Sequence, residues 1–152
     1  MKIQLGVVEQ KYTTGTASTS EVANFLETKY GILGAMVQKK APDIQRALEG
    51  SFVKGFEEVA AGLPQRNVYA GGLSQIQAMM KQWLSTQEVE RVGLPGVPTK
   101  AALDGVSHRF KSGLKGVTMA QKRKGVRKGQ RRPSFIDTGL MQASYRAWID
   151  EA

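Results

Sequence analysis

The basic residues of this chain are concentrated in one stretch near its C-terminus. Lys122–Arg132, the basic segment, places seven Lys and Arg residues in eleven positions, beside glycines and one apolar residue, Val126. Such a composition buries too little apolar surface to offset the conformational entropy that folding removes. We therefore expect an exposed and mobile basic loop with glycines over residues 115–133, outside the core that the rest of the chain forms.

The rest of the chain is close to neutral. Residues 1–96 hold 10 basic and 9 acidic residues, whereas residues 97–152 hold 12 and 4, which together give the net charge of +9. A chain of 152 residues, 41% of them hydrophobic, has the usual size of one domain with one core. We expect a single domain over residues 1–152 and no membrane partner, because no apolar run approaches the roughly 18 residues of a membrane span.

Hydrophobic periodicity predicts an α+β fold, a mostly helical single domain of about four to five helices with a small sheet. Apolar residues alternate at positions 3, 5 and 7 and again at 145, 147 and 149, so the sheet is expected from an N-terminal and a C-terminal strand. One helical turn is expected before the last strand. Residues 13–20 are small and polar and predict a linker, with Ser20 as the N-cap of a helix that loosens at Gly31 and Gly34.

Longer helices are expected in the middle of the chain. Apolar residues recur at three- and four-residue intervals from Ile44 to Ala60, after an opening at Pro42 and Asp43, and Gly62–Pro64 ends this helix. Residues 66–70 suggest a short strand. The next helix runs from Leu73 toward Val92, and its Met and Trp residues are expected in the core. Thr99 is then the expected cap of a helix through Leu103, Val106, Phe110 and Leu114.

Several classes of chemistry are excluded by residue type. The chain has no cysteine and a single histidine, His108, which excludes disulfides, thiolate metal sites, cysteine nucleophiles and multi-histidine metal sites. No Gly-Lys dipeptide exists for a Walker A phosphate loop. The pairs Glu57–Glu58 and Glu88/Glu90 point in different directions on a helix, so we expect solvated faces. We expect no enzymatic activity, no catalytic residue, no metal and no cofactor.

Asp137-Thr138-Gly139 follows two apolar residues, as the Asp-Thr-Gly of aspartic proteases does. That chemistry requires two carboxylates that share one proton, hence a second copy of the motif, and an all-β body. Most of this chain is instead predicted to be helical. We therefore expect Asp137 or Thr138 to cap a short helix by satisfying its exposed amides.

The basic segment is the best candidate for a binding function. Phosphate neutralisation requires only cations in no particular order, so non-specific contact with the backbone of duplex DNA is one hypothesis. No aromatic residue interleaves the cations to stack on single strands, and no base-reading motif is present. Docking against an acidic protein neighbour is equally consistent. The residues of this DNA-facing or docking loop are Lys122, Arg123, Lys124, Arg127, Lys128, Arg131 and Arg132.

The segment that follows resembles a known family. Its signature positions are Pro133, Phe135, Ile136, Asp137, Thr138, Gly139, Leu140 and Ser144. This segment is similar to the C-terminal signature of the tail-completion, neck (head–tail joining) and virion-morphogenesis proteins of tailed bacteriophages. In that signature, a basic or glycine-rich loop is followed by a proline, an apolar pair, Asp-Thr-Gly-Leu and, four residues later, a serine. The resemblance covers about 15–20 residues of the chain.

The resemblance implies a small α+β structural protein of the virion neck or tail, present in the host cytoplasm during assembly. Its copies would form a sixfold or twelvefold homo-oligomeric ring at the head–tail junction. The implied neighbours are the portal or head-completion protein and the tail terminator or tail tube, with duplex DNA passing through without sequence preference. The alternative is a free, non-specific duplex nucleic-acid-binding protein. Few residues follow the last strand, so we expect it to pair with Lys2–Val8 or with the edge of a neighbouring subunit.

Overall fold

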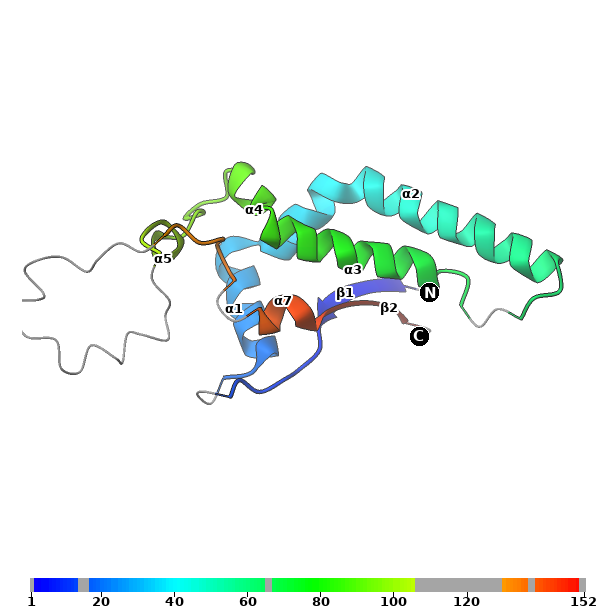
Figure 1. Ribbon diagram of the computed structural model, residues 1–152, viewed down its shortest axis with the longest axis horizontal. Helices are drawn as coiled ribbons and strands as arrows, with labels where there is room; N and C mark the ends of the chain where they lie inside the picture. The colour runs from blue at the N-terminus through cyan, green and yellow to red at the C-terminus, as the bar shows by residue number, and fades with distance from the viewer. Residues whose placement is uncertain (1, 14–16, 65–66, 106–129, 137–138, 151–152) are drawn as a thin grey trace, which may run out of the picture.

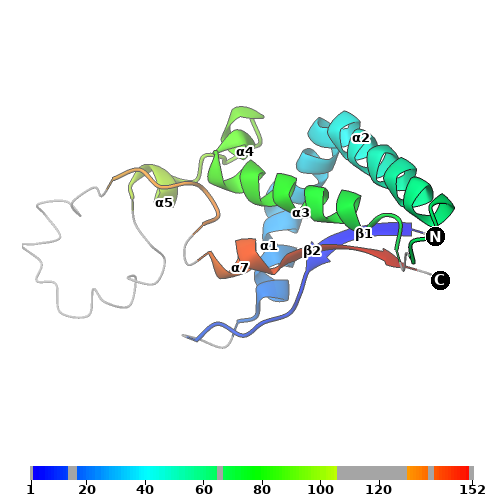
Figure 2. The ribbon, with the colours of Figure 1, turned by 45° about the vertical axis from the view of Figure 1, so that its right-hand side comes forward.

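The computed structural model describes residues 2–13, 17–64, 67–105, 130–136 and 139–150, and every structural statement below concerns these residues. They form six helices and two strands, which confirms the expected α+β class. Figure 1 shows three layers, with α2 on one side of α3 and the small sheet on the other. The turned view in Figure 2 shows the same order of layers.

The two ends of the described chain form the sheet. β1 (Lys2–Val7) and β2 (Tyr145–Asp150) pair antiparallel, with Leu5 opposite Ala147 and Val7 opposite Tyr145. The alternation therefore predicted both strands correctly, and β2 pairs with the N-terminal strand of its own chain. Tyr145 and Ala147 are buried on the face that packs against the helices, whereas Arg146 and Trp148, which alternate with them in β2, are exposed.

The N-cap of α1 (Thr19–Tyr30) lies two residues earlier than predicted. Ser18, rather than Ser20, is the N-cap, and it forms a capping box with Glu21. Ser18 and Thr19 are buried, and the Thr19 hydroxyl donates to the carbonyl of Val8 at 2.7 Å. The end of the expected linker over residues 13–20 is thus anchored to the residues that follow β1, because the buried Thr19 hydroxyl bonds both Val8 and Gln10.

α2 (Ile32–Ala60) begins ten residues before the predicted opening at Pro42, which lies inside the helix. Gly31 adopts the left-handed conformation, with φ of 63°, and ends α1 while α2 begins at the next residue. A proline inside a helix removes one backbone hydrogen bond. Ile32 and Met36 are completely buried in the first turns of α2, and this burial offsets the loss at the exposed Pro42.

α3 (Ala70–Ser85) supplies more of the buried hydrophobic residues than any other described element. It buries Leu73, Ile76, Met80, Trp83 and Leu84, which confirms that the Met and Trp residues are core residues. The predicted strand is absent from residues 67–69, which form a turn before α3. The predicted single helix toward residue 92 is also broken, because a left-handed residue at position 87 separates α3 from α4 (Glu88–Arg91).

Two short helices lie on either side of positions 106–129, the longest range that the structure does not describe. Thr99 caps α5 (Lys100–Leu103) as predicted, by accepting from the amide of Ala102 at 3.2 Å. The predicted continuation of this helix lies outside the described residues from position 106 onward. α7 (Leu140–Ser144) is the predicted turn before the last strand. Its N-cap is Gly139, with φ of 76° and no side-chain cap, whereas Asp137 and Thr138 lie outside the described residues.

Candidate functional site

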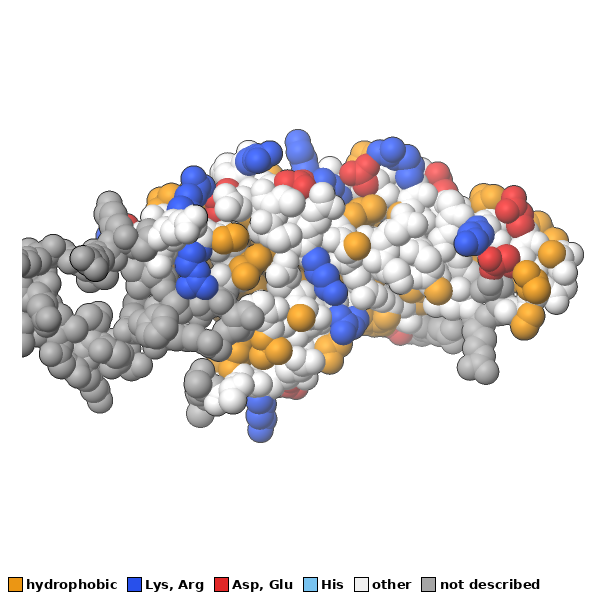
Figure 3. Space-filling view, in the orientation of Figure 1, with side chains coloured by type: hydrophobic (Ala, Val, Ile, Leu, Met, Phe, Trp, Pro, Cys, Tyr) orange, Lys and Arg blue, Asp and Glu red, His pale blue; other side chains and the backbone are white. Residues whose placement is uncertain are grey.

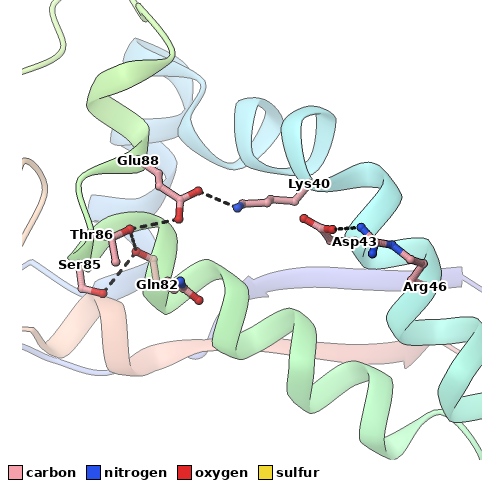
Figure 4. Close-up of polar contacts among 7 residues, drawn as sticks. All are labelled: Lys40, Asp43, Arg46, Gln82, Ser85, Thr86 and Glu88. Atoms are coloured by element: carbon pink, nitrogen blue, oxygen red, sulfur yellow. Dashed lines mark hydrogen bonds and ion pairs between the residues drawn. The ribbon is translucent and has the colours of Figure 1, made fainter.

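The short helix α4 carries two glutamates that bind two different parts of the molecule. Glu88 faces α2, where its carboxylate accepts from the Lys40 ammonium at 2.7 Å. Thr86 donates to the same carboxylate at 3.2 Å (Figure 4). The hydrogen bond from Lys40 lowers the pKa of Glu88, against an opposing effect of burial. Glu88 therefore holds α4 against α2 as an ionised group.

Glu90 faces the other way and is nearly enclosed, with a side chain only 4% exposed. One carboxylate oxygen accepts from the backbone amide of Ser134 at 2.9 Å and from its hydroxyl at 2.7 Å. The other oxygen accepts from the guanidinium of Arg131. The expectation that Glu88 and Glu90 point apart is confirmed, but the expected solvated face is wrong for Glu90.

The environment of Glu90 keeps it ionised. Burial by itself raises the pKa of this carboxyl, but the hydrogen bonds from Ser134 and Arg131 outweigh burial and leave the pKa below its ordinary value. A carboxylate with both oxygens occupied by donors of its own chain is an attachment point for the backbone. It is poorly suited to accept a substrate proton, since the neighbouring groups already use its lone pairs.

This attachment extends to α5. The hydroxyl of Ser134 also accepts from the backbone amide of Thr99 at 3.2 Å, and the amide of Arg132 donates to the carbonyl of Ala102 at 3.0 Å. We call this network of Glu90, Ser134, Thr99 and Arg131 the Glu90 anchor. It fixes the described residues on both sides of positions 106–129 next to each other, at one end of the body (Figure 1).

The structure describes only some of the residues predicted for the basic loop. Arg131 and Arg132 lie at the anchor, where Arg131 pairs with Glu90 and Arg132 is half-buried. The remaining predicted cations, Lys122, Arg123, Lys124, Arg127 and Lys128, lie outside the described residues. The anchor therefore brings together the end of the basic segment and two residues that the sequence did not predict as site residues, Glu90 and Ser134.

The described signature residues are packing residues. Phe135 lies against the ring of Tyr30, with centroids 5.1 Å apart, and Ile136 packs at the edge of the main core. The hydroxyl of Ser144 donates to the carbonyl of Leu140 at 2.7 Å, which closes the turn that leads into β2. The described part of the signature thus joins the basic segment to the sheet.

A cleft beside the anchor lies between α2, the end of α3 and α4. It is lined by Lys39, Lys40, Asp43, Trp83, Thr86, Glu88, Arg91 and Val92. Its charges are largely matched within the chain, because Lys40 pairs with Glu88 and Asp43 pairs with Arg46 (Figure 4). Among the described residues, no group of three or more His, Cys, Asp or Glu side chains is placed to hold a metal ion.

Comparison of the chain with protein-family models, with curated proteins and with solved structures found no match. Within the described parts of the chain, no helix is both long enough and apolar enough to cross a membrane.

Proposed function

We propose that this protein is a non-enzymatic structural component of the neck of a tailed bacteriophage. Copies of it form a ring at the head–tail junction, between the portal or head-completion protein and the tail terminator or tail tube. The basic segment of each copy faces the DNA channel or an acidic neighbour in the neck. The proposal rests on the resemblance of residues 133–144 together with the Glu90 anchor, which binds Arg131 at the described end of that segment.

The observation that carries this proposal is the position of the anchor. Eleven basic residues and one acidic residue lie between positions 100 and 132, and the described borders of this region are fixed side by side. A protein that surrounds passing DNA needs cations without sequence preference, and attached loop borders keep such cations at one place on each subunit. The anchor supplies that attachment, because it ties both borders to α4.

The signature supports the same proposal through its structural role. Its described residues pack into the core and lead directly into β2, so they stabilise the sheet on which the fold depends. None of them presents a nucleophile or an acid–base pair to solvent. Packing residues in the part of the chain that carries the resemblance are consistent with a structural protein.

The test is to locate the chain in phage particles. We expect cryo-electron microscopy of particles whose genome encodes this chain to show a ring of this subunit at the neck. An affinity tag on residue 150 or beyond, labelled with gold, is expected at the head–tail junction. Finding the tagged chain in infected cells and never in purified, infectious particles would contradict the proposal.

The second candidate is a free duplex-binding protein, and the excess of ten basic over acidic residues within positions 100–132 favours it. If all seven cations of the basic segment contacted phosphates, the slope of log affinity against log salt would be roughly −6. Replacing Lys122, Arg123 and Lys124 with Gln should then weaken duplex binding by the monomer and reduce the slope to roughly −4. The matched control replaces the exposed Lys11, Lys39 and Lys54, far from this segment in sequence.

A further inference from the structure

The apolar stripe of α2 continues beyond the point where the fold covers it. In the first part of the stripe, Ile44, Ala47 and Leu48 pack against the core. The second part and the turn after it expose five large apolar side chains: Phe52, Val53, Phe56, Val59 and Leu63. Phe56 is 64% exposed. We call residues 52–63 the α2 tip.

The α2 tip is uncovered because α3 begins too late to reach it. Val68 packs against Gly55, so closely that a Cβ at this glycine would lie 2.7 Å from the Val68 Cβ. The chain then turns into α3 at Ala70 and runs back toward the core. Figure 1 shows α2 extending past the start of α3, and Phe56, Val59 and Leu63 are exposed in this last part of α2 and the turn after it.

The aromatic rings of the tip contact one another and a ring outside the tip. Phe52 stacks on Phe56, with centroids 6.5 Å apart, and on Tyr69, with centroids 5.8 Å apart. Aromatic side chains held in place lose little rotamer entropy on binding, and buried aromatic residues contribute much of the energy of protein interfaces. A contiguous apolar surface of this kind on a monomer marks an interaction site.

Charge indicates what covers the tip. Residues 49–63 hold Glu49, Glu57 and Glu58 against one cation, Lys54. Figure 3 shows acidic and apolar side chains together at the end where α2 stops. Tip-to-tip contact between two copies would bring like charges together, and an anionic lipid surface or a nucleic acid would be repelled in the same way. The surface that would match the tip in both polarity and charge is therefore apolar with basic residues around its edge.

The opposite end of this chain exposes both apolar and basic side chains on its short helices. Val92 and Leu103 are exposed apolar residues that follow α4 and end α5, and the exposed cations Arg91 and Lys100 lie on the same two helices. The two glutamates of α4 are already bound by Lys40 and Arg131. The Glu90 anchor holds α4 and α5 together, because Glu90 and Thr99 both bind Ser134.

We propose that the α2 tip of one copy binds the α4–α5 end of a second copy. Phe56 and Val59 pack on Val92 and Leu103, and Glu57 faces Arg91 or Lys100. This contact is head-to-tail, and head-to-tail contacts generate closed rings or helical filaments rather than twofold dimers. The contact itself follows from the two surfaces, and only the closing of the ring rests on the proposed function.

The absence of cysteine from the chain allows a direct test. Val59→Cys and Leu103→Cys are made in separate full-length chains, mixed at the highest soluble concentration and oxidised with a mild catalyst. We expect a disulfide-linked dimer from the mixture, and much less from either chain alone. The double variant should give a ladder of oligomers on a non-reducing gel. Phe25→Cys, at an exposed residue of α1, replaces Val59→Cys in the control and should give no dimer with Leu103→Cys.

Two variant sets test the chemistry of the contact by analytical ultracentrifugation. Phe56→Ser should weaken self-association at least tenfold, whereas Phe25→Ser, at a similarly exposed phenylalanine on another helix, should leave it unchanged. Glu57→Lys and Arg91→Glu should each weaken it, and the two changes on separate chains should restore association when mixed. Cross-linking of Val59→Cys mainly with itself would instead show a tip-to-tip dimer and overturn the proposal, as would an absence of any Val59–Leu103 product.

Failure of this contact can be told apart from failure of the proposed function. The same double variant is introduced into phage particles and oxidised there. A neck ring without the Val59–Leu103 cross-link would retain the function and overturn the contact. A head-to-tail ladder from purified protein, with no copy of the chain in particles, would retain the contact and overturn the function.

Discussion

The Glu90 anchor and the α2 tip lie at opposite ends of the molecule and differ in how completely the chain satisfies them. At the anchor, a buried carboxylate receives every hydrogen bond it needs from Ser134 and Arg131. At the tip, phenylalanine and valine side chains remain in contact with water. The difference indicates that the anchor contributes to the stability of the monomer, whereas the tip contributes free energy only when another surface covers it.

Substitutions at the two ends should therefore affect different measurements. A change at the anchor is expected to lower the free energy of unfolding, and a change at the tip is expected to lower the affinity between copies. Each of the following experiments would strengthen or break this division.

The largest loss of stability is expected for Glu90→Ala. The substitution leaves the amide and the hydroxyl of Ser134 without their acceptor in a buried place, so it should lower the free energy of unfolding by about 3 kcal/mol. Urea unfolding followed by circular dichroism measures it. Glu57→Ala, at an exposed glutamate of the tip, is the control and should change stability by less than about 0.5 kcal/mol. Equal losses in the two variants would break the division.

A smaller loss is expected where α3 packs closely on α2. A Cβ at Gly72 would lie 2.8 Å from the carbonyl oxygen of Ala47, so Gly72→Ala must separate the helices and should cost about 2 kcal/mol. A Cβ at Gly50, inside α2, would have no described atom outside its own helix within 4 Å. Gly50→Ala is the matched control and should raise the free energy of unfolding by about 0.5–1 kcal/mol, because alanine favours the helix. A loss in both variants would argue against close packing as the cause.

The free energy of unfolding should depend on pH because Glu90 titrates. Its pKa in the folded protein is below the ordinary value of 4.5, so its contribution is present above that pH and is lost as the pH falls through the folded pKa. Glu90→Gln keeps an acceptor for Ser134 but cannot titrate. The difference in unfolding free energy between the native chain and this variant should be constant near neutral pH and shrink below about pH 4.5. Thermal unfolding across a pH series measures it, and a difference that grows in acid would contradict the assignment.

The smallest effect on stability is expected at the tip. Phe56→Ser removes a ring that is mostly in water, so at concentrations where the chain is monomeric the free energy of unfolding should change by less than about 0.5 kcal/mol. The same variant is expected to lose self-association. A loss of monomer stability as large as that of Glu90→Ala would show that the tip is part of the core and would remove the contrast between the two ends.

Local patterns predicted much of the fold. Alternation identified β1 and β2, a single threonine identified the cap of α5, and the spacing of Met and Trp residues identified the core face of α3. The start of α2 was missed because Pro42 is a strong local signal against a helix interior, and only the burial of Ile32 and Met36 in the folded protein opposes it. Predictions from local sequence patterns were therefore least reliable where burial in the folded protein determines the secondary structure.

The anchor could not be predicted for a related reason. Glu90 and Ser134 are 44 residues apart, and neither lies in a motif that calls for the other. Exposed glutamates are the rule on helices, so the sequence favoured a solvated face for Glu90. The α2 tip shows the opposite case, since its residues continue an apolar pattern that is typical of a core, and only the late start of α3 leaves them exposed.

The pairing of β1 with β2 has a consequence for how the chain folds. Lys2 and Asp150 are partners in the sheet, so the pairing joins segments separated by almost the whole described chain. Contacts of such large separation form slowly, because a long loop must close before they contribute energy. During synthesis β1 stays without a strand partner until residues 145–150 emerge. A chain truncated before residue 145 should therefore expose β1 as an unpaired strand, which makes incomplete copies prone to aggregation rather than to assembly.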